Sequence, residues 1–233
     1  MVYGMPFDDV IDVLGWELFK GLRINRFTSG KAAGYCSANL PIEKTVPLCY
    51  LVGATIGDGC LRHGTEGSYF VSFEMSDKSI LSLIQKSFFT VFGLSKKIKR
   101  IKRTDGRRSY LLKYSNKIVY YFLQRFFNLG PRKAKKVGVF GLENLTRAQK
   151  SALLLGLYHT DGSFTKNSLR FYTSSNRLKN DIETILTGLG YAFNTYAYQR
   201  ESYSTEYQVC ISNPQKLVSE LFAVEAELIK QNI

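Results

Sequence analysis

The sequence predicts an α+β protein built from two similar halves, and three observations support this prediction. An apolar run that ends in Asp-Gly occurs twice, at residues 51–59 (LVGATIGDG) and 154–162 (LLGLYHTDG). The two aspartates, Asp58 and Asp161, are separated by about the length of a small domain. Each run is followed by a similar alternation of strand patterns and helical patterns, which indicates an internal duplication.

The N-terminal segment, residues 1–44, does not match the repeat and is predicted to be an extension. Apolar residues at helical spacing indicate a short helix over 9–19, whereas 23–39 is rich in Gly, Ser and Ala and is predicted to be a loop. The extension could be an arm that contacts DNA, a cap on the first half, or a remnant of a fused upstream reading frame. The remaining boundaries are a first half over 45–130, a basic linker over 131–145 and a second half over 146–233.

The first half is predicted to begin with a helix that carries the first motif. Thr45 and Pro47 are typical of a helix start, and Gly59 is expected to end the helix in the left-handed conformation. The other elements expected in this half are a strand over 69–75, a helix over 79–92, a hairpin around a turn at 104–107 and a helix over 116–128.

The second half repeats this order. Thr146 and Gln149 form a capping-box pattern that opens the second motif helix, and Gly162 corresponds to Gly59. The elements expected after it are a strand over 168–174, a helix over 176–189, a hairpin formed by 191–200 and 205–211, and a helix over 213–229. The similarity extends beyond the motifs, because residues 110–116 (YLLKYSN) match 207–213 (YQVCISN).

The predicted motif helices contain glycines at interior positions, where glycine would destabilise an isolated helix. Gly53 and Gly57 are four residues apart on one face, as are Gly156 and Thr160 in the second copy. A glycine inside a helix costs about 1 kcal/mol relative to alanine. We therefore expect another backbone to approach this face closely. Packing the two helix ends together would place two carboxylates side by side, which is costly unless a cation joins them.

Both copies resemble the LAGLIDADG motif of homing endonucleases, in the form that carries two motifs in one chain. The resemblance implies a monomer of two pseudo-symmetric αββαββα halves, with motif helices packed at the centre and antiparallel, saddle-shaped sheets that grip a long double-stranded DNA site. It implies that Asp58 and Asp161 bind Mg²⁺, with Mn²⁺ as a substitute, assisted by the carbonyls of Gly57 and Thr160. Each half would cut one strand and leave short 3′ overhangs, as in intron homing.

The chemistry around the acids is expected to be less symmetric. Lys113 or Lys117 could be the catalytic lysine of the first half, although either could simply contact phosphate or remain solvated. The corresponding region of the second half contains Cys210 and Lys216. Where the family often has Gln after a strand of the first half, this chain has Asp77. One strand could therefore be cut faster, or one half could have lost activity.

The composition indicates a polyanionic partner. The formal net charge is +13 and the sequence pI is about 9.5. The residues expected to contact DNA are Lys97, Lys99, Arg103, Arg108 and Lys113 in the first half, and Arg170, Tyr172, Tyr196, Tyr198, Arg200 and Gln208 in the second.

Other classes of protein are disfavoured. The sequence has no run of about 18 apolar residues that would span a membrane. Four scattered cysteines and two histidines argue against a zinc site. We expect an intracellular, non-secreted protein of the cytoplasm or an organelle matrix. Two alternatives keep the same fold: an RNA maturase that binds intron RNA and assists splicing, and a catalytically silent DNA-binding protein.

Overall fold

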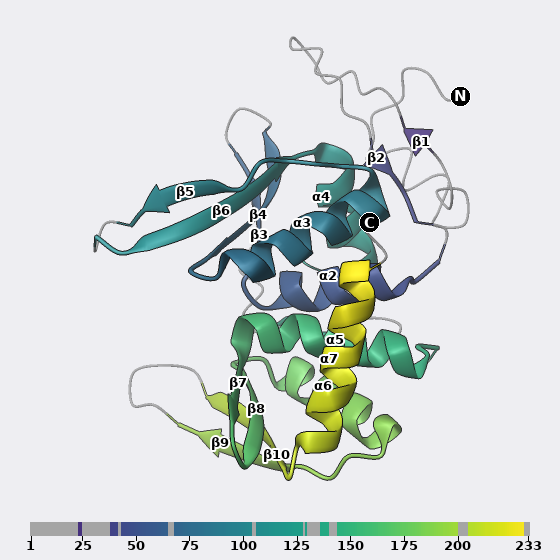
Figure 1. The fold of residues 1–233 in the computed structure, drawn as a ribbon, viewed down its shortest axis with the longest axis vertical. Helices are drawn as coiled ribbons and strands as arrows, with labels where there is room; N and C mark the ends of the chain where they lie inside the picture. The colour runs from purple at the N-terminus through teal and green to yellow at the C-terminus, as the bar shows by residue number, and fades with distance from the viewer. Residues whose placement is uncertain are drawn as a thin grey trace.

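The computed structural model describes residues 23–24, 38–41, 43–64, 68–103, 106–127, 129, 136–139, 144–199 and 205–230. The helix expected over 9–19, most of the linker over 131–145, and Arg200 lie outside these residues. Within them, six helices and two four-stranded antiparallel sheets form two similar halves (Figure 1). This confirms the predicted fold class.

The first half contains α2 (Val46–Ile56), β3 (Cys60–His63), β4 (Tyr69–Met75), α3 (Lys78–Phe92), β5 (Lys99–Lys102), β6 (Arg108–Ser115) and α4 (Lys117–Phe127). The second half contains α5 (Arg147–Asp161), β7 (Gly162–Thr165), β8 (Ser168–Thr173), α6 (Asn176–Leu189), β9 (Asn194–Tyr198), β10 (Glu206–Ser212) and α7 (Gln215–Lys230). The sheet orders β3-β4-β6-β5 and β7-β8-β10-β9 correspond strand for strand. Each half is therefore αββαββα.

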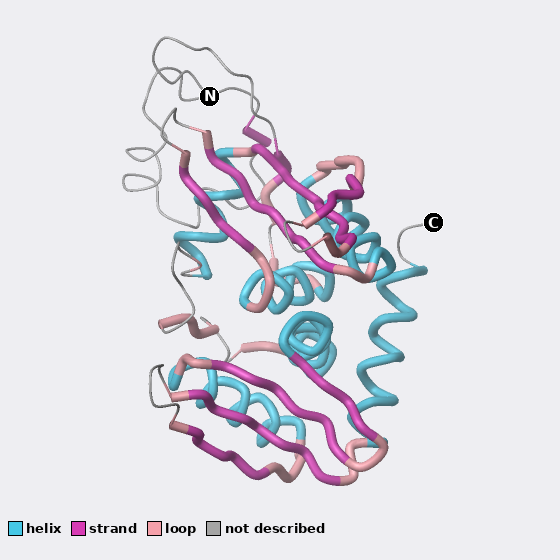
Figure 2. Tube along the Cα trace, turned by 90° about the vertical axis from the view of Figure 1, so that its left-hand side faces the viewer, coloured by secondary structure: helices cyan, strands magenta, loops and turns pink. Residues whose placement is uncertain are grey.

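The motif helices α2 and α5 pack against each other at the centre of the molecule. Figure 2 shows the two sheets on opposite sides of this pair. Alternating residues of each sheet enter the core, as Val71 and Phe73 do on β4 and Leu169 and Phe171 do on β8. No helix in the described part of the chain is long and apolar enough to cross a membrane.

The helix ends follow the predicted capping chemistry. The Thr45 hydroxyl accepts a hydrogen bond from the backbone N–H of Leu48 at the start of α2. Thr146 and Gln149 form the expected reciprocal capping box at the start of α5. Gly93 ends α3 with a φ of 67°, which an L-residue with a side chain rarely adopts. These local signals are sufficient to locate three of the helix boundaries.

Three local predictions are wrong. Gly59 and Gly162 are not left-handed: Gly59 is not among the positive-φ residues, and Gly162 is extended with φ −98° and ψ 159°. Residues 23–39 do not form only a loop, because β1 (Arg23–Ile24) pairs with β2 (Ala38–Asn39). The strand expected over 191–200 is confined to β9. The sequence pattern also does not predict β3 and β7, the first strand of each sheet.

The two motif glycines are required for space rather than for an unusual φ. A β-carbon on Gly59 would lie 2.5 Å from Cα of Thr55, and one on Gly162 would lie 2.6 Å from Cα of Tyr158. In both halves the glycine lies between the motif helix and the first strand of the sheet, or begins that strand, and it packs against the last helical turn. A side chain at either position would collide with that turn.

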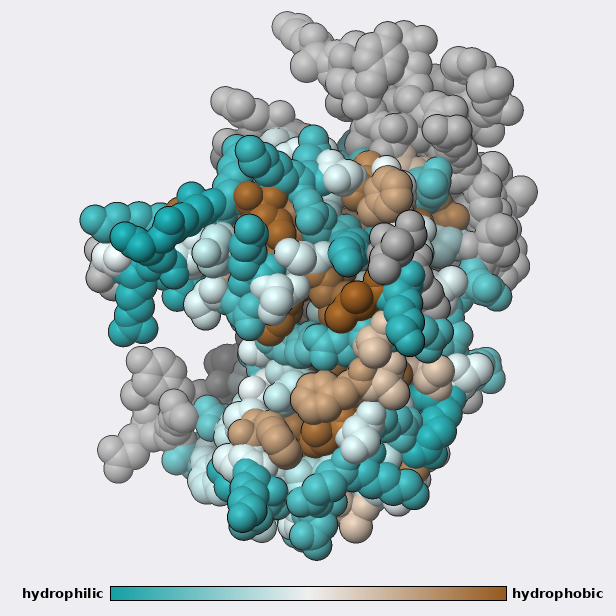
Figure 3. Space-filling view, viewed as in Figure 1, coloured by the Kyte–Doolittle hydropathy of each residue, from teal (hydrophilic) through white to brown (hydrophobic). Residues whose placement is uncertain are grey.

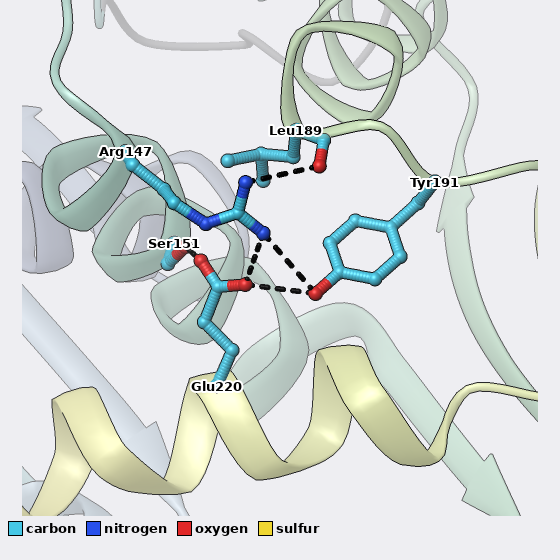
Figure 4. Close-up of polar contacts among 5 residues, drawn as sticks. All are labelled: Arg147, Ser151, Leu189, Tyr191 and Glu220. Carbon is cyan, nitrogen blue, oxygen red and sulfur yellow. Dashed lines mark hydrogen bonds and ion pairs between the residues drawn. The ribbon is translucent and has the colours of Figure 1, made fainter.

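A polar cluster attaches α7 to the start of α5 (Figure 4). The Glu220 carboxylate accepts hydrogen bonds from Arg147 Nη2 at 2.6 Å, from the Tyr191 hydroxyl at 2.8 Å and from the Ser151 hydroxyl. Arg147 also donates to the Leu189 carbonyl. Partial burial disfavours the Glu220 charge, but these donors outweigh that effect and lower its pKa. The cluster fixes the end of α5 opposite Asp161.

Candidate active site at the crossing of two helices

The central crossing depends on two glycines that face each other's backbone. A β-carbon placed on Gly53 would lie 2.2 Å from the Leu153 carbonyl oxygen, and one on Gly156 would lie 2.3 Å from the Tyr50 carbonyl oxygen. Residues Pro47 to Ile56 of α2 are all buried. The close backbone approach predicted from the repeated glycines is therefore present.

This approach brings the acidic ends of α2 and α5 together. A β-carbon on Gly57 would lie 2.0 Å from Oγ1 of Thr160 and 3.0 Å from Oδ2 of Asp161. The Asp161 carboxylate thus lies against the residue that precedes Asp58. Both aspartates are exposed. Two carboxylates from opposite halves consequently share one solvent-accessible region.

The two acids are presented by different backbone geometry. Helix α2 ends at Ile56, and Gly57 has φ −70° and ψ −102°, so Asp58 follows the helix. Helix α5 continues through Asp161, and the Thr160 hydroxyl donates to the carbonyls of Gly156 and Leu157 at 3.0 and 3.1 Å. The pseudo-symmetry of the fold is therefore not exact at the carboxylates.

A pocket of about 340 Å³ lies beside these residues. Gly57 and Asp161 line it together with Tyr172 and Glu206 from the second sheet, and Val137 forms another part of its wall. The Ser175 hydroxyl donates to the Val137 carbonyl at 2.5 Å, which holds this part of the linker in place. Glu206 adds a second carboxylate to the lining of this pocket.

The available donors fit a hard divalent cation. Both exposed aspartates present oxygen ligands, and Mg²⁺ prefers oxygen and retains several waters. In the part of the chain that the structure describes, no group of three or more His, Cys, Asp or Glu residues is arranged to enclose a metal. A cation here would thus complete its coordination with water or phosphate oxygens, as Mg²⁺ commonly does.

The two candidate lysines lie at different distances from the acids. The cross-strand partners Cys60, Ser72 and Lys113 form one row of the first sheet, and Cys60 is only two residues after Asp58. Lys117 instead lies near the opposite end of β4, with its Nζ 5.1 Å from the centre of the Tyr69 ring. The backbone of Lys113 therefore lies in the row nearer the acids, while its Nζ lies 3.7 Å from the centre of the Phe70 ring, two residues further along β4 from them.

Asp77 has a structural role in the position where the family often has Gln. Its Oδ1 accepts from the backbone N–H of Ser79 at 2.7 Å and from the Ser79 hydroxyl at 2.6 Å, which caps α3. The Ser79 side-chain hydrogen bond is the main cause of the lowered Asp77 pKa. Ser175 similarly caps α6 through the backbone N–H of Leu178.

Apart from Arg200, which lies outside the described residues, the residues expected to contact DNA in the second half share one face of the sheet. Gln208 pairs with Tyr172 on one side and Tyr196 on the other, while Cys210 pairs with Arg170. Tyr196 and Tyr198 are 46% and 48% exposed. A polar and aromatic surface therefore runs across β8, β10 and β9.

The first-half candidates are less uniform. Lys97, Lys99 and Lys113 are exposed. Arg103 is exposed but donates to Glu74 at 2.7 Å, so part of its charge is already neutralised. Arg108 lies on the opposite face of β6 from Lys113, in register with Lys102. The sequence gives no sign of the Glu74 contact, because its partners are distant in the chain.

The sequence profile of the LAGLIDADG-like domain matches residues 45–126 and 148–221. Among solved structures, mesophilic variants of the homing endonuclease I-DmoI superpose with a TM-score of 0.56 at 18% identity, covering 78% of this chain and 98% of that one. I-DmoI in complex with DNA and Ca gives 0.55 at 17% identity, covering 78% and 90%.

Full-length DUF199/WhiA from Thermatoga maritima has a TM-score of 0.51 at 12% identity, covering 82% of this chain and 62% of that chain. A comparison with curated proteins gives no significant match. At these identities, the structural likenesses establish a shared fold.

Proposed function

Because the chain belongs to the LAGLIDADG-like domain family, we propose that it is a sequence-specific endonuclease that cleaves both strands of double-stranded DNA. The observation that carries this proposal is the close packing of α2 against α5 through facing glycines, which brings the ends of the two helices, with Asp58 and Asp161, together. The family profile matches each half separately, which agrees with one acid for each DNA strand.

In the proposed mechanism, Asp58 and Asp161 would hold divalent cations, and the carbonyls of Gly57 and Thr160 would assist. When bound, such cations neutralise the phosphate charge, activate water and stabilise the leaving oxygen. Lys113 would place a further positive charge near the phosphate of the first half. The exposed position of both acids leaves room for the DNA backbone to reach them.

Two features support a short staggered cut and a single-chain enzyme. The Asp161 carboxylate lies against Gly57, the neighbour of Asp58, so two scissile phosphates served by these acids would lie within one short region of the duplex. Staggered cleavage with 3′ overhangs, as in intron homing, suits that arrangement. One chain supplies both acids and both sheets, so a monomer is sufficient.

The proposed partner and cofactor agree with the conditions of related structures. I-DmoI was crystallised with DNA together with Ca or Mn, and a variant of it with DNA and Mg. We propose Mg²⁺ as the cofactor, with Mn²⁺ as a substitute, because the aspartates offer only oxygen ligands. The net charge of +13 favours binding to a polyanion.

The decisive experiment is selection of cleaved sites from a random duplex library with Mg²⁺, followed by variants of the two acids. Asp58→Asn and Asp161→Asn should each abolish double-strand cleavage, with rates reduced at least about 100-fold, while DNA affinity changes little. Glu227→Gln on the exposed surface of α7 is the control and should cleave normally.

Full activity of either aspartate variant would remove that acid from the mechanism. If the unmodified chain gives no cleaved product but binds intron RNA tightly, the maturase alternative replaces the nuclease. Tight, metal-independent binding to DNA without cleavage would instead identify a silent DNA-binding protein.

A further inference from the structure

Equivalent rows of cross-strand partners in the two sheets each contain one basic residue, but that residue lies on a different strand in each sheet. In the first sheet, Cys60, Ser72 and Lys113 are cross-strand partners. The equivalent row of the second sheet contains Ser163, Arg170 and Cys210. Both rows begin two residues after a motif aspartate, so we call each one the acid-proximal row.

Within the acid-proximal row, the basic residue of the second half lies one strand away from the position of the basic residue in the first half. Lys113 on β6 corresponds to Cys210 on β10, while Ser72 on β4 corresponds to Arg170 on β8. Cα atoms of directly opposed residues in antiparallel strands are about 4.5–5.5 Å apart. The long arginine side chain can cover that separation, so the same region of space can be reached from the neighbouring strand.

The surroundings of Arg170 orient its guanidinium without neutralising it. Its Nε donates to the Ser168 hydroxyl at 3.2 Å, and interactions with the side chains of Tyr172 and then Cys210 raise its pKa. Across the described residues, no ion pair joins Arg170 to an acid, in contrast to Arg103 and Glu74. The charge is thus held by neutral partners and remains available to an anion.

Tyr172 connects Arg170 to the candidate active site. The Tyr172 hydroxyl lies 3.2 Å from the hydroxyl of Ser163, which is two residues after Asp161. Tyr172 also lines the pocket that contains Asp161. The guanidinium therefore belongs to a polar chain that leads to the acid of the second half.

We propose that Arg170 binds the scissile phosphate of the strand served by the second half, the position that Lys113 fills in the first half and that Cys210 cannot fill. This inference rests on the proposed nuclease function. Arginine binds phosphate through a planar fork of donors, whereas lysine acts as a compact point charge. The two strands would thus be cut with different cationic assistance.

The test measures the cleavage rate of each strand separately at a site selected with the unmodified chain. Arg170→Ser should slow one strand on the order of 100-fold and accumulate nicked duplex, while the other strand changes less than about threefold. Lys113→Ser is the matched control and should slow the opposite strand. Arg170→Lys should recover most of the lost rate.

Cross-strand rescue distinguishes a phosphate-binding role from a structural one. The double variant Arg170→Ser/Cys210→Lys returns the cation to the strand used in the first half and should restore cleavage of the slowed strand. Thermal unfolding of all variants should be similar, because Arg170 lies on the partly exposed outer face of the sheet.

A binding measurement with Ca²⁺ gives a readout independent of cleavage. An uncharged methylphosphonate at the second-half cleavage position should weaken binding of the unmodified chain several-fold, but should not weaken binding of Arg170→Ser further. Equal slowing of both strands, failure of the rescue, or additive effects in this binding cycle would overturn the assignment of Arg170. If the unmodified chain cleaves no duplex, the proposed function fails and this inference fails with it.

Discussion

Among single residues, His159 has an unusual environment because it is a buried imidazole between the two halves. Its Nδ1 lies 3.1 Å from the Tyr50 hydroxyl, and its Nε2 lies 3.8 Å from the Glu225 carboxylate. The side chain is only 7% exposed. Burial lowers the pKa of His159 to about 4, although Asp77 acts in the opposite direction. The imidazole is therefore neutral at pH 7.

We expect His159 to make the free energy of unfolding depend on pH. The unfolded chain binds this proton near the usual pKa of about 6.5, whereas the folded chain binds it only near 4, so stability falls as the pH drops through this window. The loss attributable to His159 is at most about 3 kcal/mol. Urea unfolding at pH 7.5 and pH 5 would measure about 2 kcal/mol of this loss, because it is complete only below pH 4.

The control variants separate His159 from its acidic neighbour. His159→Gln should show a smaller loss of stability between these pH values than the unmodified chain. Burial raises the pKa of Glu225, so that group favours the folded state as pH falls and partly offsets the histidine. Glu225→Gln should therefore steepen the loss. Equal pH dependence of the unmodified chain and His159→Gln would contradict the assignment.

At the level of single residues, a repeat in the sequence predicts position better than strand register does. Asp58 and Asp161 could be paired because both terminate the same motif. The contact between Arg103 and Glu74, the face occupied by Arg108 and the place of Glu206 in the pocket depend on strand pairing. Strand pairing of distant segments is not encoded by local periodicity.

Among the structural elements, the crossing of α2 and α5 is the least tolerant of added volume. Gly53→Ala or Gly156→Ala would place a methyl group about 2.2–2.3 Å from a backbone oxygen of the other helix. Because neither backbone can move without disturbing a buried helix, each substitution should lower the free energy of unfolding by about 1–3 kcal/mol or more. Denaturant unfolding would measure this loss.

Gly188→Ala is a matched control for the crossing. Gly188 also lies in a helix, α6, but it is exposed, and the nearest atom to an added β-carbon is Nζ of Lys150 at 3.0 Å. That flexible side chain can move away, so alanine should be neutral or should stabilise the helix by up to about 1 kcal/mol. Equal destabilisation by Gly188→Ala and Gly53→Ala would show that the crossing has no special requirement.

The sequence predicts the long elements better than the short ones. Helices such as α3 and α6 have both an apolar stripe and capping residues, so their limits could be located closely. Strands β3 and β7 have only four residues each and begin within four residues of the end of a motif helix. Four residues are too few for a clear period, and the adjoining glycines suggested a turn where the structure has extended chain.

Across the whole molecule, the two sheets differ strongly in charge. The described strands of the first sheet carry Arg62, Lys99, Arg100, Lys102, Arg108 and Lys113, whereas those of the second sheet carry Arg170 as their basic residue. Figure 3 shows hydrophilic surface over the projecting β5–β6 hairpin. The first half is therefore expected to provide most of the electrostatic attraction to DNA.

This asymmetry predicts which lysines determine the salt dependence of DNA binding. Lys97→Gln and Lys99→Gln should each reduce the slope of log affinity against log salt by about 1, because each removes a phosphate contact. Lys230→Gln on the exposed surface of α7 is the control and should leave the slope unchanged. Filter binding or fluorescence anisotropy at several salt concentrations would measure the slopes, and an unchanged slope in the Lys97 and Lys99 variants would exclude these residues as phosphate contacts.

The unequal pair Gly57 and Thr160 also has an evolutionary consequence. Two copies of the second half, assembled in the same way, would place Thr160 opposite Thr160. Gly57 now lies opposite Thr160, and a β-carbon built on Gly57 would lie only 2.6 Å from the β-carbon of Thr160. Two copies of the first half would leave the space of that side chain empty. The two halves are similar in sequence and fold, yet at this point each fits the other and would fit a copy of itself poorly.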